Sequence, residues 1–203
     1  MKAHTLLILF TFFQVLFCDL EGLSLSKIQE IYEKTLPYMK AFHPENIYIP
    51  FSFRFLLPKF NYDELGKNNT HFSLDEYNVL HVKFINLKGK MTGRFKAGNI
   101  WKTGAYQDFV ANLTNITYEQ SYNVKTTKEA NGKYSFKYRK VGESELNFKV
   151  SLNFTSSSSI SNRALYTDMA TSSIKNLNFT EFRAHLGKLQ GLLLDNIATE
   201  LSK

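Results

Sequence analysis

The chain has 203 residues, a formal net charge of +7 and an aromatic content of 15%. Its single cysteine excludes a zinc or iron–sulfur site built from several cysteines. The sequence also lacks HExxH, Gly-x-Ser-x-Gly, a phosphate-binding loop and a dinucleotide-binding glycine fingerprint. We therefore name no catalytic residue, metal ligand or cofactor, and expect a protein that is not an enzyme.

The first 18 residues are typical of a secretory signal peptide. Lys2 supplies a basic start, and the apolar run Thr5–Phe17 follows it. This run is shorter than the ~20 apolar residues that a transmembrane helix needs. We predict cleavage after Cys18, which leaves residues 19–203 as one secreted, extracellular domain. Without a cysteine, that domain must be held by its own core.

An amphipathic helix is predicted to begin at Ser26, with Gln29 as its capping-box partner. Apolar residues then recur at steps of three and four, which places them on one helical face. They are Leu25, Ile28, Ile31, Tyr32, Leu36, Met39 and Phe42. Pro37 lies late in this pattern, so we expect the helix to kink or end near Thr35 or Leu36.

The next segment, Ile47–Pro58, is strongly apolar but contains two prolines. Proline cannot donate to a central ladder, so we interpret this segment as an extended piece or an edge strand lying on the core. Lys59–His71 is polar and indicates a turn region. Strands are expected after it, separated by glycines, over Leu74–Asn78, Val79–Leu87 and Lys90–Phe95.

Two-residue alternation of apolar and polar side chains appears three times between Tyr106 and Phe154. Such alternation is typical of antiparallel strands with one buried face. The apolar positions are Ile116, Tyr118, Tyr122 and Val124, then Tyr134, Phe136 and Tyr138 after a turn at Asn131-Gly132, then Leu146, Phe148, Val150, Leu152 and Phe154.

A long amphipathic helix is predicted to end the chain, capped by Asn178 or Thr180 and with Glu181 in its first turn. Its apolar stripe consists of Phe179, Phe182, Leu186, Leu189, Leu193, Ile197 and Leu201. Gly187 and Gly191 favour a close approach of this helix to a sheet or a ligand, and a locally weak helix is the alternative. The fold class is therefore α+β, with N- and C-terminal helices packed against an antiparallel sheet.

The aromatic face of this sheet has two interpretations. It is either an ordinary filled core, which the periodicity alone favours, or one wall of an elongated apolar cavity with buried tyrosine hydroxyls as polar contacts. The predicted lining residues of that cavity are Ile116, Tyr118, Tyr122, Val124, Tyr134, Phe136, Tyr138, Phe148, Val150, Leu152, Leu189, Leu193 and Ile197.

Five Asn-x-Ser/Thr sequons are candidate glycosylation sites: Asn68, Asn112, Asn115, Asn153 and Asn178. Asn68 lies in a predicted turn and Asn153 on the polar side of its strand, so these two are the strongest candidates. The basic residues are spread out, with Lys133, Lys137, Arg139 and Lys140 as the densest group. We interpret this group as a solvated sheet face, with weak contact to an anionic membrane surface as the alternative. Nucleic acid is disfavoured as a partner, because no recognisable module is present.

These segments together resemble the TULIP superfamily of lipid-binding proteins. More narrowly, they resemble the arthropod juvenile hormone-binding and takeout-like proteins and the related mite allergens. The resemblance rests on the signal, the first helix, Ile47–Pro58, the glycines of 89–104, Phe109–Tyr118, Ala130–Phe136, Leu146–Phe154 and the last helix. It implies a long helix cradled in a strongly curved antiparallel sheet, with a tunnel for a hydrophobic ligand. The chain departs from this resemblance in one respect. Takeout-like proteins usually carry a disulfide near the mature N-terminus, and this chain has no cysteine after the predicted signal peptide.

The leading hypothesis is a secreted, non-enzymatic carrier of lipids, fatty acids or terpenoid hormones. One alternative is a secreted interaction or surface-active protein, salivary, seminal or allergen-like, with a filled core. Another is a lipocalin-like barrel, which predicts Gly-x-Trp near the first strand, whereas Trp101 lies halfway along this chain. The residues leave the ligand, the oligomeric state and the occupied sequons open.

Overall fold

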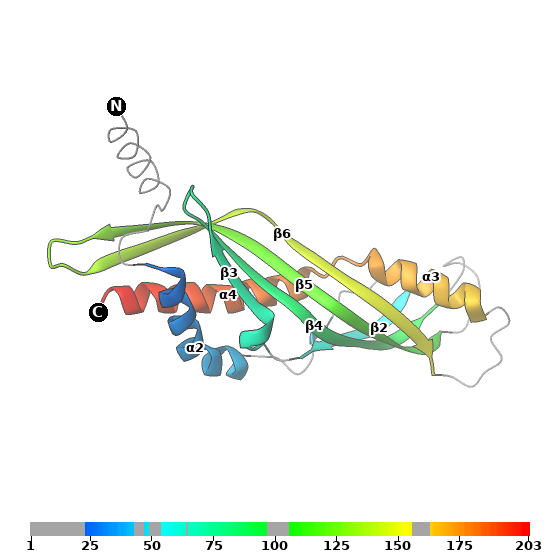
Figure 1. Cartoon of the computed structure of the whole chain (residues 1–203). Coiled ribbons are helices and arrows are strands. Elements are labelled where there is room, and N and C mark those ends of the chain that lie inside the picture. The colour runs from blue at the N-terminus through cyan, green and yellow to red at the C-terminus, as the bar shows by residue number, and fades with distance from the viewer. Residues whose placement is uncertain (1–22, 43–46, 49–53, 64, 97–105, 156–162) are drawn as a thin grey trace, which may run out of the picture.

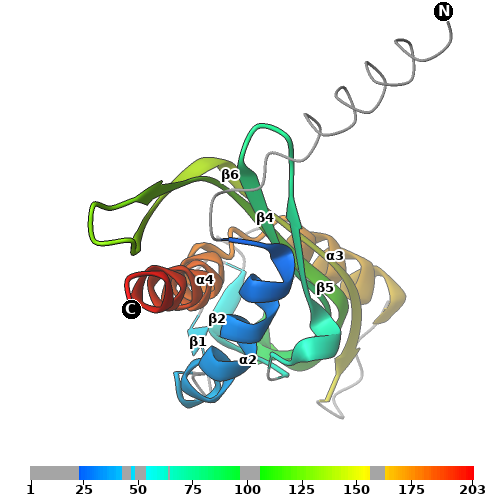
Figure 2. The ribbon, with the colours of Figure 1, turned by 60° about the vertical axis from the view of Figure 1, so that its left-hand side comes forward.

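The structure is a computed structural model that describes residues 23–42, 47–48, 54–63, 65–96, 106–155 and 163–203. A long C-terminal helix lies inside the curve of a strongly curled antiparallel sheet (Figures 1 and 2). The predicted α+β class, with a helix near each end of the chain, is confirmed. The predicted signal peptide and its cleavage site lie outside the described residues.

The sheet has the strand order β1-β2-β4-β5-β6, and its pairs are antiparallel. The strands are β1 (Ile47–Tyr48), β2 (Phe55–Tyr62), β3 (Thr70–Leu74), β4 (Val79–Phe95), β5 (Gln107–Lys128) and β6 (Tyr134–Phe154). β3 and β2 follow one another along the same edge of β4, because Thr70 pairs with Phe84 and Tyr62 pairs with Gly89.

Two of the three long strands, β4 and β6, are each continuous where the sequence predicts separate pieces. Val79–Leu87 and Lys90–Phe95 are both parts of β4, and the runs around Phe136 and Phe148 are both parts of β6. Each strand crosses at least one register shift, and Asn86, Asn115 and Gly142 have positive φ values of 55°, 52° and 65°. Bulges bend a strand and increase its twist, so one long strand can follow the curve of the sheet from end to end.

β2 corrects one expectation. Lys59–His71 is not a turn region throughout, because β2 continues to Tyr62 and β3 begins at Thr70. The predicted edge position of Ile47–Pro58 agrees with the described part of that segment: β1 is the edge strand, and it pairs with β2 only at Lys59 and Phe60, beyond Pro58. The register of β2 against β4 shifts between Leu56 and Lys59, and this irregularity accommodates a residue without an N–H.

The predicted strand Leu74–Asn78 is wrong beyond Leu74, which ends β3, because Asp75–Asn78 forms the turn between β3 and β4. The Asp75 side chain accepts hydrogen bonds from the backbone N–H groups of Tyr77, at 2.9 Å, and Val79, at 2.8 Å. An aspartate that bonds its own backbone two residues on favours a turn over a strand.

The first described helix, α2 (Leu25–Ala41), has Ser24 as its N-cap instead of Ser26. The Ser24 hydroxyl accepts from the Lys27 N–H at 3.2 Å. Of the two outcomes expected near Leu36, a kink or an end of the helix, the end is wrong, because the helix continues past Pro37. Pro37 is exposed, so water can satisfy the carbonyl that loses its helical partner. Buried Thr35 and Met39 hold the helix on either side of the proline.

The predicted terminal helix is α4 (Thr180–Leu201), with Glu181 in its first turn. Its N-cap is Phe179, which makes no capping hydrogen bond, so the predicted caps are wrong. The Phe179 ring is buried 5.2 Å from the ring of Phe148 and 6.0 Å from that of Phe60. Packing of this ring fixes the start of the helix. A further helix, α3 (Arg163–Lys175), packs against β6 and is missing from the predicted elements. Its inner face is formed by Tyr166, Met169, Ala170 and Ile174, which follow helical spacing.

Replacing Phe60 with alanine is expected to lower the free energy of unfolding by about 3–5 kcal/mol, because its ring is fully buried against α4. Urea denaturation measures this loss. Tyr77→Ala is the matched control, since Tyr77 is 74% exposed in the β3–β4 turn, and it should change stability by no more than about 0.5 kcal/mol. Equal effects of the two substitutions would contradict the placement of β2 in the core.

Candidate functional site: the interior between the sheet and α4

The concave face of the sheet and the inner face of α4 enclose one continuous apolar layer. All the predicted lining residues belong to it. Nine are buried: Ile116, Tyr118, Tyr122, Val124, Phe136, Leu152, Leu189, Leu193 and Ile197. Four are partly buried and pack against them: Tyr134, Tyr138, Phe148 and Val150. That any of them contacts a ligand stays a prediction.

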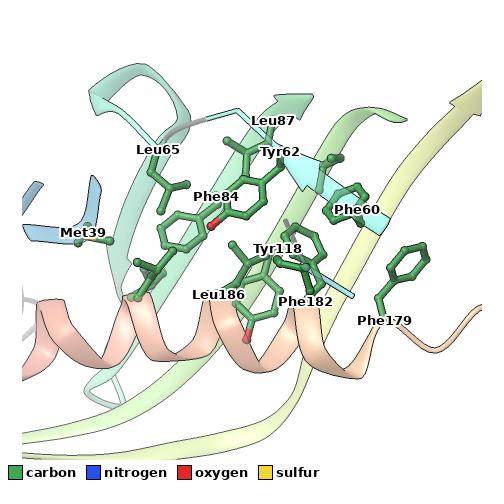
Figure 3. Close-up of a cluster of buried hydrophobic side chains, with 14 of the residues drawn as sticks. Met39, Phe60, Tyr62, Leu65, Phe84, Leu87, Tyr118, Phe179, Phe182 and Leu186 are labelled. Carbon is green, nitrogen blue, oxygen red and sulfur yellow. The ribbon is translucent and has the colours of Figure 1, made fainter. Parts of the chain in front are cut away.

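Several residues of this layer are missing from the predicted lining. Phe60 and Tyr62 of β2 lie against Phe182 of α4, with ring centroids 4.6 Å and 5.1 Å apart (Figure 3). Leu80, Val82 and Phe84 of β4 are fully buried. Alternation is the signal that could have identified both groups, because Phe60 and Tyr62, and then Leu80 to Phe84, are spaced by two.

A buried polar chain ties α4 to the sheet. The Tyr122 hydroxyl donates to Gln190 Oε1 at 2.9 Å, and Gln190 Nε2 donates to the Val82 carbonyl oxygen at 3.0 Å. Gln190 is fully buried within the apolar stripe of α4, where heptad spacing gives no reason to expect a polar side chain. Burial raises the pKa of Tyr122, so its hydroxyl remains a neutral donor.

Two further tyrosine hydroxyls connect a helix to a strand. Tyr32 of α2 and Thr70 of β3 share a buried hydrogen bond of 2.7 Å. The Tyr138 hydroxyl of β6 donates to Asp195 Oδ1 of α4 at 2.8 Å. Burial, and then the neighbouring Asp195 carboxylate, raises the pKa of Tyr138 to about 12. The interior therefore offers neutral hydroxyl and amide groups rather than charges.

The two glycines of α4 differ in what surrounds them. A Cβ placed on Gly187 would make an ordinary van der Waals contact, at 3.4 Å, with the Tyr118 hydroxyl. A Cβ placed on Gly191 would have no atom within 4 Å. Close approach of the helix to the sheet therefore accounts for neither glycine.

Two pockets reach this layer from the surface on different parts of α4. One of about 450 Å³ is lined by Tyr118, Lys140, Glu143, Ser144, Asn178, Thr180, Arg183, Ala184 and Gly187. The other, of about 420 Å³, lies between α2 and α4 and is lined by Ile31, Lys34, Thr35, Tyr38, Leu192, Asn196, Thr199, Glu200 and Lys203. Each joins one buried core residue, Tyr118 or Ile31, to charged side chains at the surface.

The predicted surface features are placed as follows. The five sequon asparagines, Asn68, Asn112, Asn115, Asn153 and Asn178, are all exposed. Of the basic group, Lys133, Lys137 and Arg139 are exposed, whereas Lys140 also lines the larger pocket. Weak contact of this group with a membrane surface stays a prediction.

Two findings bear on other classes of site. Within the described ranges, no three side chains of His, Cys, Asp or Glu gather where they could hold a metal ion. In the same ranges, every helix is too short or too polar to span a bilayer.

Comparisons with known proteins give matches to solved structures alone. No protein-family model matches the sequence, and no curated protein matches it. The chain is similar to Takeout 1 of Epiphyas postvittana, with 15% identity, a TM-score of 0.38, and coverage of 87% of this chain and 91% of that one. It is also similar to a lipopolysaccharide binding protein, with 10% identity, a TM-score of 0.33, and coverage of 88% of this chain and 38% of that one. Both likenesses have TM-scores below 0.5, so the functional argument below rests on the chain's own geometry.

The Tyr122–Gln190 hydrogen bond should be measurable by a double-mutant cycle. Tyr122→Phe leaves Gln190 Oε1 buried without its donor, and Gln190→Met leaves the tyrosine hydroxyl unpaired. Each should lower the free energy of unfolding by about 1–3 kcal/mol. In urea denaturation, the double variant should lose about 1 kcal/mol less free energy of unfolding than the sum of the two single losses. Strictly additive losses would contradict the bond, and Tyr77→Phe in the exposed turn is the control.

Proposed function

We propose that this protein is a secreted, non-enzymatic carrier of small hydrophobic molecules such as lipids, fatty acids or terpenoids. The ligand would lie between the concave face of the sheet and α4, against the predicted lining residues. One observation carries the proposal: the inner face of α4 is buried from Phe182 to Leu201 along the sheet and α2. A continuous apolar layer of this length is the kind of surface on which an extended apolar molecule can bind.

The energetics of such a carrier follow from desolvation. Transfer of apolar surface out of water yields ~25 cal/mol per Å², so an alkyl or terpenoid chain enclosed beside α4 would bind without any charge in the interior. The hydroxyls of Tyr122 and Tyr138 and the amide of Gln190 supply neutral polar contacts. They would orient a ligand that carries one or two oxygen atoms.

A second candidate is a secreted interaction protein with a filled core. It is favoured by the packing of aromatic rings on one another, because Phe60, Tyr62 and Phe182 lie within 4.6–6.4 Å of each other by ring centroids. The carrier function therefore requires some of these side chains to move when a ligand enters. The lipocalin-like alternative has less support, because β1 and β6 form the two ends of an unclosed strand order among the described residues.

Displacement of a fluorescent fatty acid from purified protein tests the carrier function. Leu189→Trp adds bulk on the buried face of α4 and is expected to weaken binding about tenfold or more, whereas Lys188→Trp on the exposed face should leave affinity unchanged. Leu189→Ala enlarges the same space and should retain binding. Near-UV circular dichroism establishes that each variant is folded.

Two results would contradict the proposal. The first is no displacement by any fatty acid, phospholipid or terpenoid with folded wild-type protein, which would favour the filled-core interaction protein. The second is a folded Leu189→Trp variant with unchanged affinity, because the ligand would then lie elsewhere.

A further inference from the structure

The larger pocket lies where the start of α4 meets β5 and β6, and its charge is unbalanced. Arg183 and Lys140 carry positive charge, and Glu143 is the one acidic side chain in its lining, so the net charge is +1. No described carboxylate forms an ion pair with either cation. Lysines elsewhere on the surface do have such partners, for example Lys83, which lies 2.7 Å from Glu119.

The guanidinium of Arg183 has more N–H donors than it has acceptors around it among the described residues. It is half-buried, and its Nη1 donates to the Ser144 carbonyl oxygen at 3.3 Å. Its Nε is buried and has no acceptor within the described part of the chain. A buried donor without an acceptor costs free energy, and the planar guanidinium is the side chain best suited to bind carboxylate or phosphate oxygens. The absence of a side-chain cap on α4 leaves the positive end of the helix dipole facing the same region.

Tyr118 joins this pocket to the apolar interior. Its ring is buried and stacks on Phe84 with centroids 6.3 Å apart, while its hydroxyl reaches Gly187 at the pocket lining. Figure 3 shows the ring beside Leu186, with the hydroxyl directed away from Phe60 and Tyr62. Tyr118 therefore borders both the pocket and the core, and movement of this side chain would open a path for an alkyl tail.

The second pocket provides an internal contrast. Its cations, Lys34 and Lys203, are already paired, Lys34 with Glu30 at 2.8 Å and Lys203 with Glu200. Both pockets open beside α4 and both contain two cations, but only the pocket at Arg183 has cations without carboxylate partners among the described residues.

We infer that the pocket at the start of α4 binds an oxyanion headgroup, a carboxylate or a phosphate, of an amphipathic ligand whose tail enters the interior past Tyr118. Arg183 provides the hydrogen-bonding fork, and Lys140 provides the second positive charge. The inference rests on the proposed carrier function and adds to it a class of ligand: long-chain acids in preference to neutral lipids.

Calorimetric titration of the mature chain, produced without glycans because Asn178 also lines this pocket, tests the inference. The probes are palmitic acid, methyl palmitate, hexadecyl phosphate and inorganic phosphate. Palmitic acid and hexadecyl phosphate should bind about tenfold or more tighter than methyl palmitate, because a charge-assisted hydrogen bond contributes more than a neutral one. Inorganic phosphate should bind at least tenfold more weakly than hexadecyl phosphate, because it has no tail.

Arg183→Gln and Lys140→Gln should each remove most of this preference and leave the affinity for methyl palmitate unchanged. Lys137→Gln is the matched control, since Lys137 lies on the same strand but outside the pocket, and it should preserve the preference. If Arg183→Gln does not fold, the Lys140→Gln variant decides the question.

The outcomes separate the two proposals. Equal affinities for palmitic acid and its methyl ester, unaffected by either variant, would overturn the headgroup site and leave the carrier function standing. Phosphate bound as tightly as hexadecyl phosphate would identify a free-anion site and overturn the link to the interior. No binding of acid or ester would overturn the carrier function itself.

Discussion

The constraint on which the rest of this structure depends is that α4 must be covered along its whole inner face. The chain has a single cysteine, so no disulfide within it can hold the helix in place. Cover comes from the concave face of the sheet and from α2, and one buried polar chain, Tyr122 to Gln190 to the Val82 carbonyl, fixes how the helix sits. Burial of the Gln190 amide is favourable only while it keeps both hydrogen-bond partners, the Tyr122 hydroxyl and the Val82 carbonyl oxygen. These two bonds therefore specify one position of the helix along the strands.

Curvature of the sheet follows from the same requirement. A flat sheet would touch a helix along a narrow line, whereas long twisted strands that bend at bulges can wrap around it. Asn86, Asn115 and Gly142 adopt positive φ beside or near the register shifts of the three long strands. Asparagine and glycine tolerate this conformation better than other residues, so the bends occur where the sequence can form them at low cost in free energy.

The faces of the strands and helices were largely predictable from the sequence, and their lengths were not. Alternation identifies Ile116, Tyr118, Tyr122 and Val124 as an inner face, and all four are buried. The alternation breaks where the register shifts. In β4 one extra residue reverses the parity, from Phe84 to Leu87. In β6 two extra residues relative to β5, between Val141 and Glu145, interrupt the apolar face without reversing it. Each of these strands therefore looks like two. Gln190 and the pocket residues Lys140 and Arg183 could not be predicted, since polar residues with no motif gain their meaning only from the segments that the fold brings together.

The interior and its surface opening impose opposite requirements on a ligand. Tight ring packing around Phe60 and Phe182 stabilises the core, and any molecule that enters must replace those contacts with its own. An apolar molecule gains desolvation but offers nothing to Arg183 and Lys140, which have no carboxylate partner among the described residues. A molecule with an anionic end gains both, and its head can bind at Arg183 before any core side chain moves. The barrier to entry then falls on Tyr118, whose hydroxyl lines the pocket while its ring belongs to the core.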